Sequence, residues 1–396
     1  MRTASSDAGA NARAIFLAKT VRTFCYGFLG ILLPVYLSEL GIGAAGIGTT
    51  VTLTLAASAA LTWSARRPAE RYGARVALVS LAILSLVAAG LLLGIRTPAA
   101  VILAAMLGNI AVGTGETGPF LALEQVVVTR AVAPERLNMT LSVYNLLGYA
   151  AGAAGAACVT VLPAGTLFAT FAAAALVQVA AYSRLRPNDR PAGRPSLPLR
   201  DLPSARRIRR LAGLFALDSF AGGFVLQSLI AYWFHVQHGL ALEALGAIFF
   251  AAHIVTALSF LAAAWLADRI GLLNTMVFSH LVSNVLLVAI AFAPSAALAV
   301  AFLLARHLLS QMDVPTRQAY VMSVVLDHER EAAASATNLS RTAAQAVAPT
   351  LTGYVMQGLA LSAPFVVGGG LKIVYDLLLY ATFRQVTPAV QPERRR

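Results

Sequence analysis

The stretch Glu70-Arg71-Tyr72-Gly73 ends one apolar segment, and Asp268-Arg269-Ile270-Gly271 ends another, 198 residues further along the chain. Each stretch places an acid, an arginine and a glycine in the same order. An acid and an arginine at a helix end can link neighbouring helices and complement their dipoles. The glycine permits a tight turn between two helices. Because the chain has 396 residues, this spacing indicates a repeat of half its length.

Two further matches support the repeat. Residues 23–28 (TFCYGF) match residues 219–224 (SFAGGF) with a shift of 196, and Asn109 and Glu116 match Arg306 and Asp313 with a shift of 197. A near-constant shift predicts two parallel halves of six helices each. We therefore expect an N-terminal half over 1–183, a basic linker over 184–210 and a C-terminal half over 211–396.

The composition excludes a soluble protein. Charged residues make up 12% of the chain, apolar residues make up 58%, and the mean hydropathy is +0.74. So few charges do not cover the surface of a soluble protein of this size. Apolar segments of the roughly 20 residues that span a bilayer recur twelve times. They lie at 18–40, 44–65, 75–95, 99–127, 137–162, 164–183, 211–236, 242–267, 272–293, 296–325, 332–360 and 364–386, which predicts an all-α membrane protein with twelve transmembrane helices.

The net charge of +13 follows a one-sided pattern. With a cytoplasmic N-terminus, the loops on that side contain nearly all the loop arginines, whereas the opposite loops contain only Arg96. This asymmetry predicts that both termini are cytoplasmic, in a cell membrane of the bacterial inner-membrane type. The basic linker is then a solvated segment beside anionic lipid, and no nucleic-acid partner is expected. Two cysteines, Cys25 and Cys158, exclude a disulfide framework and a cysteine metal cluster.

These features resemble the major facilitator superfamily over nearly the whole chain. Its signature after helix 2, G-x-x-x-D-R-x-G-x-R, is matched by residues 66–75, with Glu70 as the acid and Arg66 in place of the first glycine. Its helix 4 signature, R-x-x-x-G-x-G, begins here with Asn109. Gly148, Gly152 and Gly155 resemble the antiporter motif of helix 5 without its proline, and ordinary small-residue packing is the alternative.

The resemblance implies a secondary transporter whose helices 1, 4, 7 and 10, which are the predicted spans 18–40, 99–127, 211–236 and 296–325, line a central cavity. We expect a monomer that takes a small-molecule substrate and protons and needs no cofactor or metal. The signature residues Glu70, Arg71, Asp268 and Arg269 are assigned to gating between conformations.

Ten ionisable residues lie within the predicted spans, where an ionised side chain costs about 2.5–3.5 kcal/mol at the bilayer centre. Most must therefore pair or line an aqueous cavity. Seven of them lie on helices 1, 4, 7 and 10. The ten are Arg22, Glu116, Glu124, Asp218, Arg306, Asp313, Arg317, Arg341, Lys372 and Asp376.

Helix 10 presents Arg306, Ser310, Asp313 and Arg317 as one stripe, and helix 4 presents Asn109, Gly113, Glu116 and Phe120 in the same way. We expect Asn109, Arg306, Ser310 and Arg317 to contact substrate and Glu116 or Asp313 to carry the coupling proton. A buried carboxyl beside an arginine can be switched when that partner moves. The alternative is a permanent Asp313–Arg317 pair.

Other polar residues have two interpretations each. Arg22 and Asp218 occupy equivalent places in helices 1 and 7 and can close a gate, or Arg22 can pair with Glu124 in its own half. Arg341, between Asn338 and Gln345, is a candidate gate or anion contact. The aromatics Tyr26, Phe28 and Phe224 line an apolar pocket or serve packing.

Three features indicate structure rather than chemistry. Lys372 and Asp376 are four residues apart and can neutralise each other. His253, His280 and His307 lie singly in separate helices, as hydrogen-bonded packing residues do. Residues 113–118 fit G-x-G-x-x-G, but they lie inside an apolar span and not after a strand, so a nucleotide site is rejected.

A transporter is thus the predicted class. An enzyme is disfavoured because the sequence has no nucleophile elbow, paired-histidine motif or recognisable catalytic dyad. A non-transporting sensor would be expected to lose the cavity charges, which are retained here. Within transporters, we expect proton-coupled export of a small amphipathic or toxic compound. The alternative substrate is a small organic anion, bound by arginines such as Arg22, Arg306, Arg317 and Arg341.

Overall fold

The computed structural model describes residues 2–110, 118–131, 134–186, 202–326 and 329–386, and no β-strand occurs among them. Contacts between residues divide the chain into two compact units. Unit 1 comprises Met1–Pro191 and Leu226–Ile254, and unit 2 comprises Ala192–Val225 and Val255–Arg396. The predicted all-α fold is confirmed.

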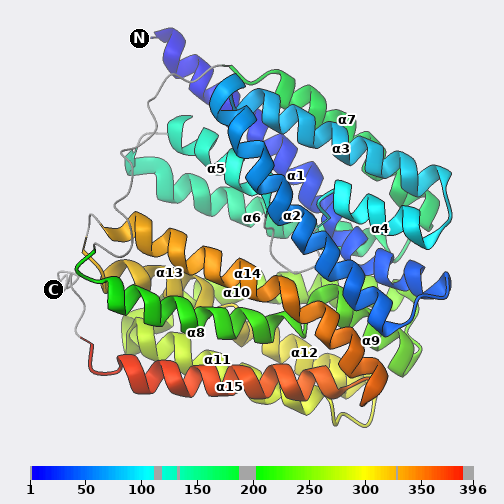
Figure 1. Ribbon diagram of the computed structural model, residues 1–396, viewed down its shortest axis with the longest axis vertical. Helices are drawn as coiled ribbons and strands as arrows, with labels where there is room; N and C mark the ends of the chain where they lie inside the picture. Colours follow the sequence, from blue (N-terminus) through cyan, green and yellow to red (C-terminus); the bar gives the residue numbers. More distant parts are fainter. Residues whose placement is uncertain (1, 111–117, 132–133, 187–201, 327–328, 387–396) are drawn as a thin grey trace. The chain divides into compact units, whose positions relative to one another are not determined.

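Unit 1 is built around its first helix. That helix packs against the sixth, seventh and ninth helices, and the third packs along the seventh (Figure 1). The helices of unit 1 are α1 (Arg2–Glu39), α2 (Ala44–Tyr72), α3 (Ala74–Gly94), α4 (Pro98–Leu107), α5 (Pro119–Ala131), α6 (Pro134–Cys158), α7 (Ala164–Ser183), α9 (Gln227–His238) and the first part of α10 (Leu242–Ile270).

Unit 2 contains the remaining helices. Its eighth helix lies against the fourteenth and fifteenth, and the eleventh lies against the twelfth, thirteenth and fifteenth (Figure 1). The helices are α8 (Ala205–Gly223), the second part of α10, α11 (Leu272–Ile290), α12 (Ala296–Ser310), α13 (Asp313–Ser323), α14 (Arg330–Gly358) and α15 (Ala363–Phe383). Each unit has its own apolar core, which includes Phe120, Tyr144 and Tyr182 in unit 1 and Phe215 and Tyr375 in unit 2.

Three of the predicted spans are interrupted. Span 99–127 becomes α4 and α5, span 211–236 becomes α8 and α9, and span 296–325 becomes α12 and α13. At the first interruption Asn109 has a left-handed backbone (φ 47°) and Gly118 has φ 106°, conformations that end one helix before the next begins. In a membrane, irregular backbone is tolerated only where protein or a cavity covers it.

The two compact units differ from the two predicted halves. Residues 226–254 follow the predicted linker but belong to unit 1. The interruption between α8 and α9 explains this, because it frees α9 to pack on α1, while Gly246 of α10 lies against the carbonyl of Ala156 in α6. The predicted linker also ends earlier than expected. Helix α8 begins at Ala205 and not at 211, so the last four linker arginines are helical.

The repeated glycines form the predicted turns. Gly73 alone separates α2 from α3 and has φ 89°, and Gly271 alone separates α10 from α11 and has φ 85°. A residue with a Cβ is strained in this backbone region. The same one-residue turn therefore occurs at equivalent places of the repeat, as its sequence predicts.

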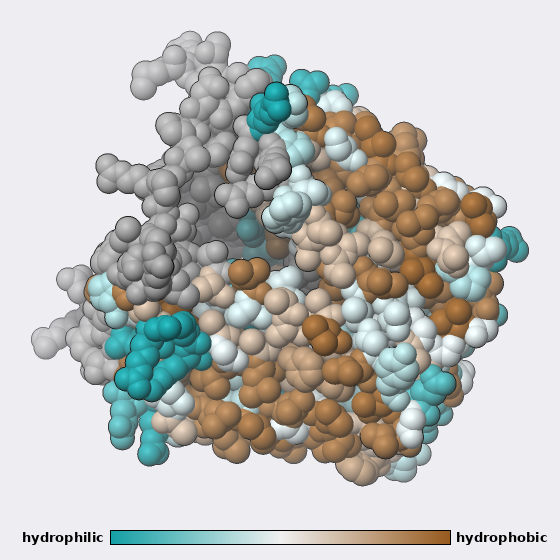
Figure 2. Space-filling model, in the orientation of Figure 1, coloured by the Kyte–Doolittle hydropathy of each residue, from teal (hydrophilic) through white to brown (hydrophobic). Residues whose placement is uncertain are grey.

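The surface is that of a protein solvated by lipid. Eight helices of the described chain are long and apolar enough to cross a membrane. Large apolar side chains such as Trp63 (74% exposed), Val161 (75%) and Leu359 (77%) point outward, and Figure 2 shows broad areas of apolar residues on one face. Exposed apolar surface of this extent marks a partner or a membrane. The chain is an integral membrane protein.

Candidate functional site

Unit 1 holds a buried set of polar side chains that we call the glutamate cluster, formed by Arg22, Glu124, Tyr144 and Tyr182. Glu124 of α5 is fully buried and binds Arg22 of α1 through both carboxylate oxygens, at 2.6 and 3.0 Å. The Tyr144 and Tyr182 hydroxyls donate to the same carboxylate, each at 2.6 Å. Each carboxylate oxygen therefore has two donors, a bidentate and well-satisfied arrangement.

The cluster ties four helices together. Tyr182 also accepts a hydrogen bond from Arg22 at 2.6 Å, and the guanidinium lies 4.6 Å from the centre of the Phe120 ring. Tyr144, Tyr182 and Phe120 are part of the apolar core of unit 1. Of the two predicted partners for Arg22, Glu124 is thus the one that it contacts in unit 1. An ion pair this deeply buried makes one arrangement of α1, α5, α6 and α7 strongly preferred.

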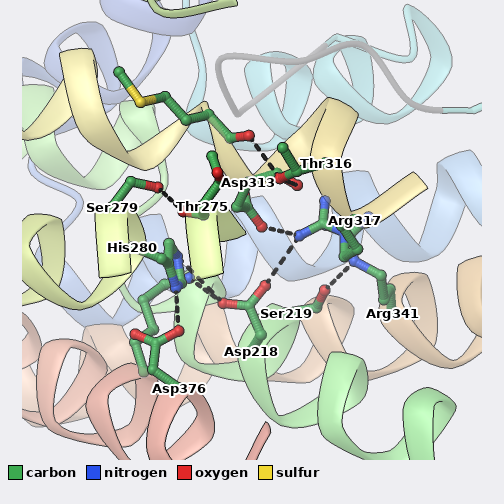
Figure 3. Close-up of polar contacts among 12 residues, drawn as sticks. Asp218, Ser219, Thr275, Ser279, His280, Asp313, Thr316, Arg317, Arg341 and Asp376 are labelled. Carbon is green, nitrogen blue, oxygen red and sulfur yellow. Dashed lines mark hydrogen bonds and ion pairs between the residues drawn. The ribbon is translucent and has the colours of Figure 1, made fainter. Parts of the chain in front are cut away.

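Unit 2 holds a second set, the aspartate network, which consists of Asp218, Ser219, His280, Asn284, Asp313, Arg317, Arg341, Lys372 and Asp376. Figure 3 labels all of these except Asn284 and Lys372. Asp218, near the end of α8, is its centre. Its Oδ1 accepts a hydrogen bond from Lys372 Nζ of α15 at 2.5 Å and lies 3.7 Å from His280 Nε2 of α11. Its Oδ2 lies 3.7 Å from Arg317 Nη1 of α13. Three helices therefore supply cationic or titratable groups to one carboxylate.

Asp376 of α15 faces the other side of the histidine. Its Oδ1 lies 2.8 Å from His280 Nδ1, and its Oδ2 accepts a hydrogen bond from Asn284 Nδ2 at 2.8 Å. Asn284 Nδ2 also lies 3.2 Å from His280 Nδ1. His280 is 4% exposed and therefore bridges two buried carboxylates (Figure 3).

The remaining members lie on α13 and α14. Arg317 forms a hydrogen-bonded ion pair with Asp313 one turn earlier on α13, as the spacing of four residues predicts. Arg341 of α14 donates from Nε to Ser219 Oγ at 2.9 Å. Through Ser219, which follows Asp218, the network reaches α14, so it joins α8, α11, α13, α14 and α15.

The charges of the network balance when the histidine is neutral. The three carboxylates Asp218, Asp313 and Asp376 match the three permanent cations Arg317, Arg341 and Lys372. A proton on His280 adds one positive charge to a buried set that is otherwise neutral. Among the described residues, no group of three or more His, Cys, Asp or Glu side chains is arranged to hold a metal ion.

Helix α12 of the same unit carries two buried polar atoms that lack hydrogen-bond partners in the described part of the chain. Arg306 is 8% exposed and Ser310 is 6% exposed, one turn apart at the end of α12. Within the described chain, Arg306 Nε and Ser310 Oγ have no hydrogen-bond partner. A buried polar group without a partner is costly. The pair is therefore chemically suited to bind a group that accepts hydrogen bonds.

Asn109, which is equivalent to Arg306 in the repeat, also has a buried polar atom without a hydrogen-bond partner among the described residues. Asn109 is 3% exposed, lies at the interruption after α4, and its Nδ2 has no partner among the described residues. The sequence predicted Asn109, Arg306 and Ser310 as substrate contacts, and all three are buried at the ends of interrupted helices. Arg317, predicted with them, is instead engaged by Asp313 and Asp218.

The predicted aromatic residues are buried. Tyr26 (6% exposed) donates to the carbonyl of Gly108 at 3.4 Å, where α4 ends. Phe28 packs edge-to-face on Phe24, and Phe224 packs in the same way on Phe220 at the equivalent place of the repeat. Their contacts are those of packing residues, the second of their two predicted interpretations.

The glycines of α6 are packed against α1. A Cβ at Gly155 would overlap the carbonyl oxygen of Phe24, and a Cβ at Gly27 would overlap the carbonyl oxygen of Gly152. A Cβ at Gly148 would lie 2.7 Å from the Lys19 side chain. Close helix approach thus accounts for the glycine spacing in this part of the chain.

The signature residues lie at the helix ends. Arg71 and Arg269 are exposed, and their guanidinium groups lie 5.3 Å and 4.3 Å from the ring centres of Tyr72 and Trp265. Asp268 is exposed. The side chain of Glu70 and all of Glu116 lie outside the described residues.

The sequence missed the partners of three residues. Lys372 and Asp376 do not neutralise each other as their spacing suggested: Lys372 binds Asp218 of α8, and Asp376 contacts His280 and Asn284 of α11. His280 was predicted to be a packing residue, whereas it bridges two aspartates. The useful signal was present in the spacing, since His280 and Asn284 lie one turn apart on the buried face of α11.

Comparison with known proteins identifies the fold. The family model of the Major Facilitator Superfamily matches residues 15–349. An uncharacterized membrane protein of Saccharomyces cerevisiae is 24% identical over 190 residues, which are 48% of this chain and 42% of the yeast protein. The chain thus spans less than half the length of that relative.

Solved transporter structures share the fold at low identity. A variant of the nucleoside transporter NupG aligns with a TM-score of 0.74 and 16% identity over 94% of this chain and 100% of its own. The human organic anion transporter MFSD10 (TETRAN) aligns with a TM-score of 0.66 and 17% identity, over 94% of this chain and 99% of its own. A D-xylose–proton symporter aligns with a TM-score of 0.69 and 11% identity, over 95% of this chain and 98% of its own.

Proposed function

The chain belongs to the major facilitator superfamily and is a membrane transporter, not an enzyme, and we propose that it moves a small organic anion coupled to protons. The observation that carries this proposal is a pair of buried donors at the end of α12, Arg306 Nε and Ser310 Oγ, which have no hydrogen-bond partner among the described residues. A carboxylate, sulfonate or phosphate accepts hydrogen bonds from both and neutralises the guanidinium.

The surrounding charge supports an anion. The aspartate network is neutral with His280 unprotonated, so the guanidinium of Arg306, which interacts electrostatically with Asp218, adds a positive charge beside a set that is already balanced. An isolated buried charge is strongly unfavourable unless something pairs with it. A bound anion supplies that pair. The fold by itself does not determine the substrate, because transporters of nucleosides, sugars and organic anions share it.

The second candidate substrate is a small amphipathic compound. Export of such a compound is favoured by the buried aromatic residues Tyr26, Phe28 and Phe224, since Tyr26 contacts the carbonyl of Gly108 at one interruption and Phe224 lies at another. Their mutual packing and the packing role of the α6 glycines weaken this candidate. It predicts that neutral amphipathic compounds bind as well as anions do.

The remaining parts of the proposal concern orientation and assembly. The arginine distribution supports cytoplasmic termini, in a membrane of the bacterial inner-membrane type. The protein acts as a monomer by alternating access. Arg341, half-buried and bonded to Ser219, is the candidate gate residue, and Asp313 is a candidate carboxyl for the proton.

The test is a ligand-stabilisation screen on the purified protein in detergent. The panel pairs aromatic and aliphatic carboxylates, sulfonates and phosphates with neutral counterparts, for example benzoate with benzamide. We expect anions to raise the midpoint of thermal unfolding and their neutral counterparts not to do so, because ligand binding stabilises the folded state.

The decisive variant is Arg306→Met. Without ligand it should be more stable than the wild type by about 1–3 kcal/mol, since it removes a buried donor that lacks a partner. It should also lose the response to anions. Arg210→Met, at an exposed position of α8, is the matched control and should keep the response. Equal stabilisation by benzoate and benzamide, unchanged in Arg306→Met, would favour the amphipathic substrate instead.

A further inference from the structure

We propose that His280 binds the coupling proton and that Asp218 changes partners when it does. The proposal rests on the proton-coupled transport proposed above and assigns its proton to a residue pair on α11 and α8. His280 lies between two carboxylates, with Nδ1 2.8 Å from Asp376 Oδ1 and Nε2 3.7 Å from Asp218 Oδ1 (Figure 3).

The geometry distinguishes the two ring nitrogens. A neutral imidazole has one N–H and one lone pair, whereas the protonated ring has two donors. The 2.8 Å contact to Asp376 places the N–H of the neutral ring on Nδ1, which leaves the lone pair on Nε2 facing Asp218. A proton on Nε2 turns that contact from lone pair against carboxylate into an attractive, charge-assisted one.

The proton then competes with a lysine. Asp218 Oδ1, the oxygen nearest His280, already accepts from Lys372 Nζ at 2.5 Å. When Nε2 gains its proton, two cations share this oxygen, and the hold of Lys372 on α8 weakens. Because Lys372 lies on α15 and Ser219 beside Asp218 holds Arg341 of α14, the change reaches three helices of unit 2.

Every packed element contributes charge around the ring. Asp218 faces it from α8, and Lys372, Tyr375 and Asp376 come from α15, with the Tyr375 ring 5.9 Å away. Helix α13 adds Asp313 and Arg317, which reach Asp218. Helix α12 adds Arg306, which interacts electrostatically with Asp218, and His307, whose Nδ1 contacts the carbonyl of Leu303.

Other candidates in the described chain fit less well. Glu124 has two donors on each oxygen, and Asp313 is held by Arg317 one turn away on its own helix. His253 and His307 each place Nδ1 against a carbonyl of the preceding turn, at 2.7 and 2.8 Å. His280 differs from both because it faces carboxylates of other helices. Imidazole is also the side chain that ordinarily changes charge between pH 5 and 8.

The test measures proton binding directly and needs no substrate. The full chain is labelled with ¹³C at histidine Cε1, purified in detergent, and titrated from pH 5 to pH 8 by NMR. One titrating signal should disappear in His280→Gln and in His280→Asn, which replace the Nε2 and Nδ1 contacts respectively without a titratable ring. It should persist in the controls His253→Gln and His307→Gln. A His280 signal that does not move over this range would overturn the proposal.

The second measurement tests the link to Asp218. The chain has two lysines, Lys19 and Lys372, which provide a matched pair. Lys372→Met should shift the midpoint of the His280 titration, because it removes the competitor for Asp218 Oδ1. Lys19→Met, in unit 1, should not change it. An unchanged midpoint in Lys372→Met would overturn the partner exchange, whereas a failed anion screen with an intact titration would count against the proposed substrate alone.

Discussion

The glutamate cluster of unit 1 and the aspartate network of unit 2 both bury charges among membrane helices. They differ in how completely the central carboxylate is hydrogen-bonded. In the cluster, both oxygens of Glu124 have two donors within 3.0 Å. In the network, Asp218 has one short contact and two at 3.7 Å. The first set has one well-satisfied arrangement. The second has close alternatives, as a switch requires.

The repeat explains how the difference arose. Arg22 and Asp218 are equivalent positions, 196 residues apart, with opposite charges. The positions equivalent to Glu124 and Phe120 are Val321 and Arg317, so unit 2 has no acid where unit 1 holds its arginine's partner. Arg22 stacks on Phe120, whereas Asp218 faces Arg317. Asp218 therefore takes its other partners from α11 and α15.

The largest expected effect is on the cluster. Glu124→Gln should lower the free energy of unfolding by about 3–5 kcal/mol, because it leaves the guanidinium of Arg22 buried without its carboxylate. Chemical denaturation in mixed micelles measures this. The double variant Arg22→Met/Glu124→Leu removes both charges and should recover most of the loss. A double variant as unstable as Glu124→Gln would show that the ion pair is not the cause.

A smaller loss of stability is expected for Asp218→Asn. Its partners have other acids within reach, since Arg317 already holds Asp313 and Lys372 is one turn from Asp376. We expect a loss of about 2–3 kcal/mol, below that of Glu124→Gln, together with loss of proton-driven transport. Denaturation and flux into vesicles carrying a pH gradient measure the two effects. Retained transport together with a large loss of stability would show that the aspartate network only stabilises the fold, as the glutamate cluster does.

Much of the fold was predictable from the sequence. The duplicated turn at Gly73 and Gly271 follows from an acid-arginine-glycine pattern, because a one-residue turn between helices needs positive φ. The interruptions were not predictable from hydropathy. Residues 224–226 are Phe-Val-Leu, as apolar as the helices on either side, so only packing reveals the break between α8 and α9.

The site was predictable only in part. The cost of burying charge identified Asp218, Arg306 and Asp313 as important, since that cost depends on each residue alone. Partners depend on which helices meet. Lys372 and Asp376 share a helix face by spacing, yet one reaches α8 and the other reaches α11. The sequence predicts only a packing role for His280, because the two carboxylates that it contacts come from helices far away in the sequence.

A third prediction sharpens the comparison within the cluster. Tyr182→Phe removes one hydroxyl that donates to Glu124 and accepts from Arg22. We expect a loss of about 1.5–2 kcal/mol, the range for hydrogen bonds to charged groups, and no change in proton-driven transport. Thermal unfolding and flux measure these. A transport defect without a stability loss would give the cluster a share in the mechanism and remove the contrast with the network.

The smallest effect is expected at the edge of the network. Ser219→Ala removes the acceptor for Arg341 Nε, but Arg341 is only half-buried, so its guanidinium can turn to solvent. The stability loss should be about 0.5–1 kcal/mol. Ser340→Ala is the matched control, because its hydroxyl bonds the carbonyl of Ala212 and joins the same two helices through backbone. If Arg341 is a gate, only Ser219→Ala should change the rate of transport while both variants unfold alike. Equal rates in the two variants would confine the switch to Asp218, His280 and Lys372 and leave α14 outside it.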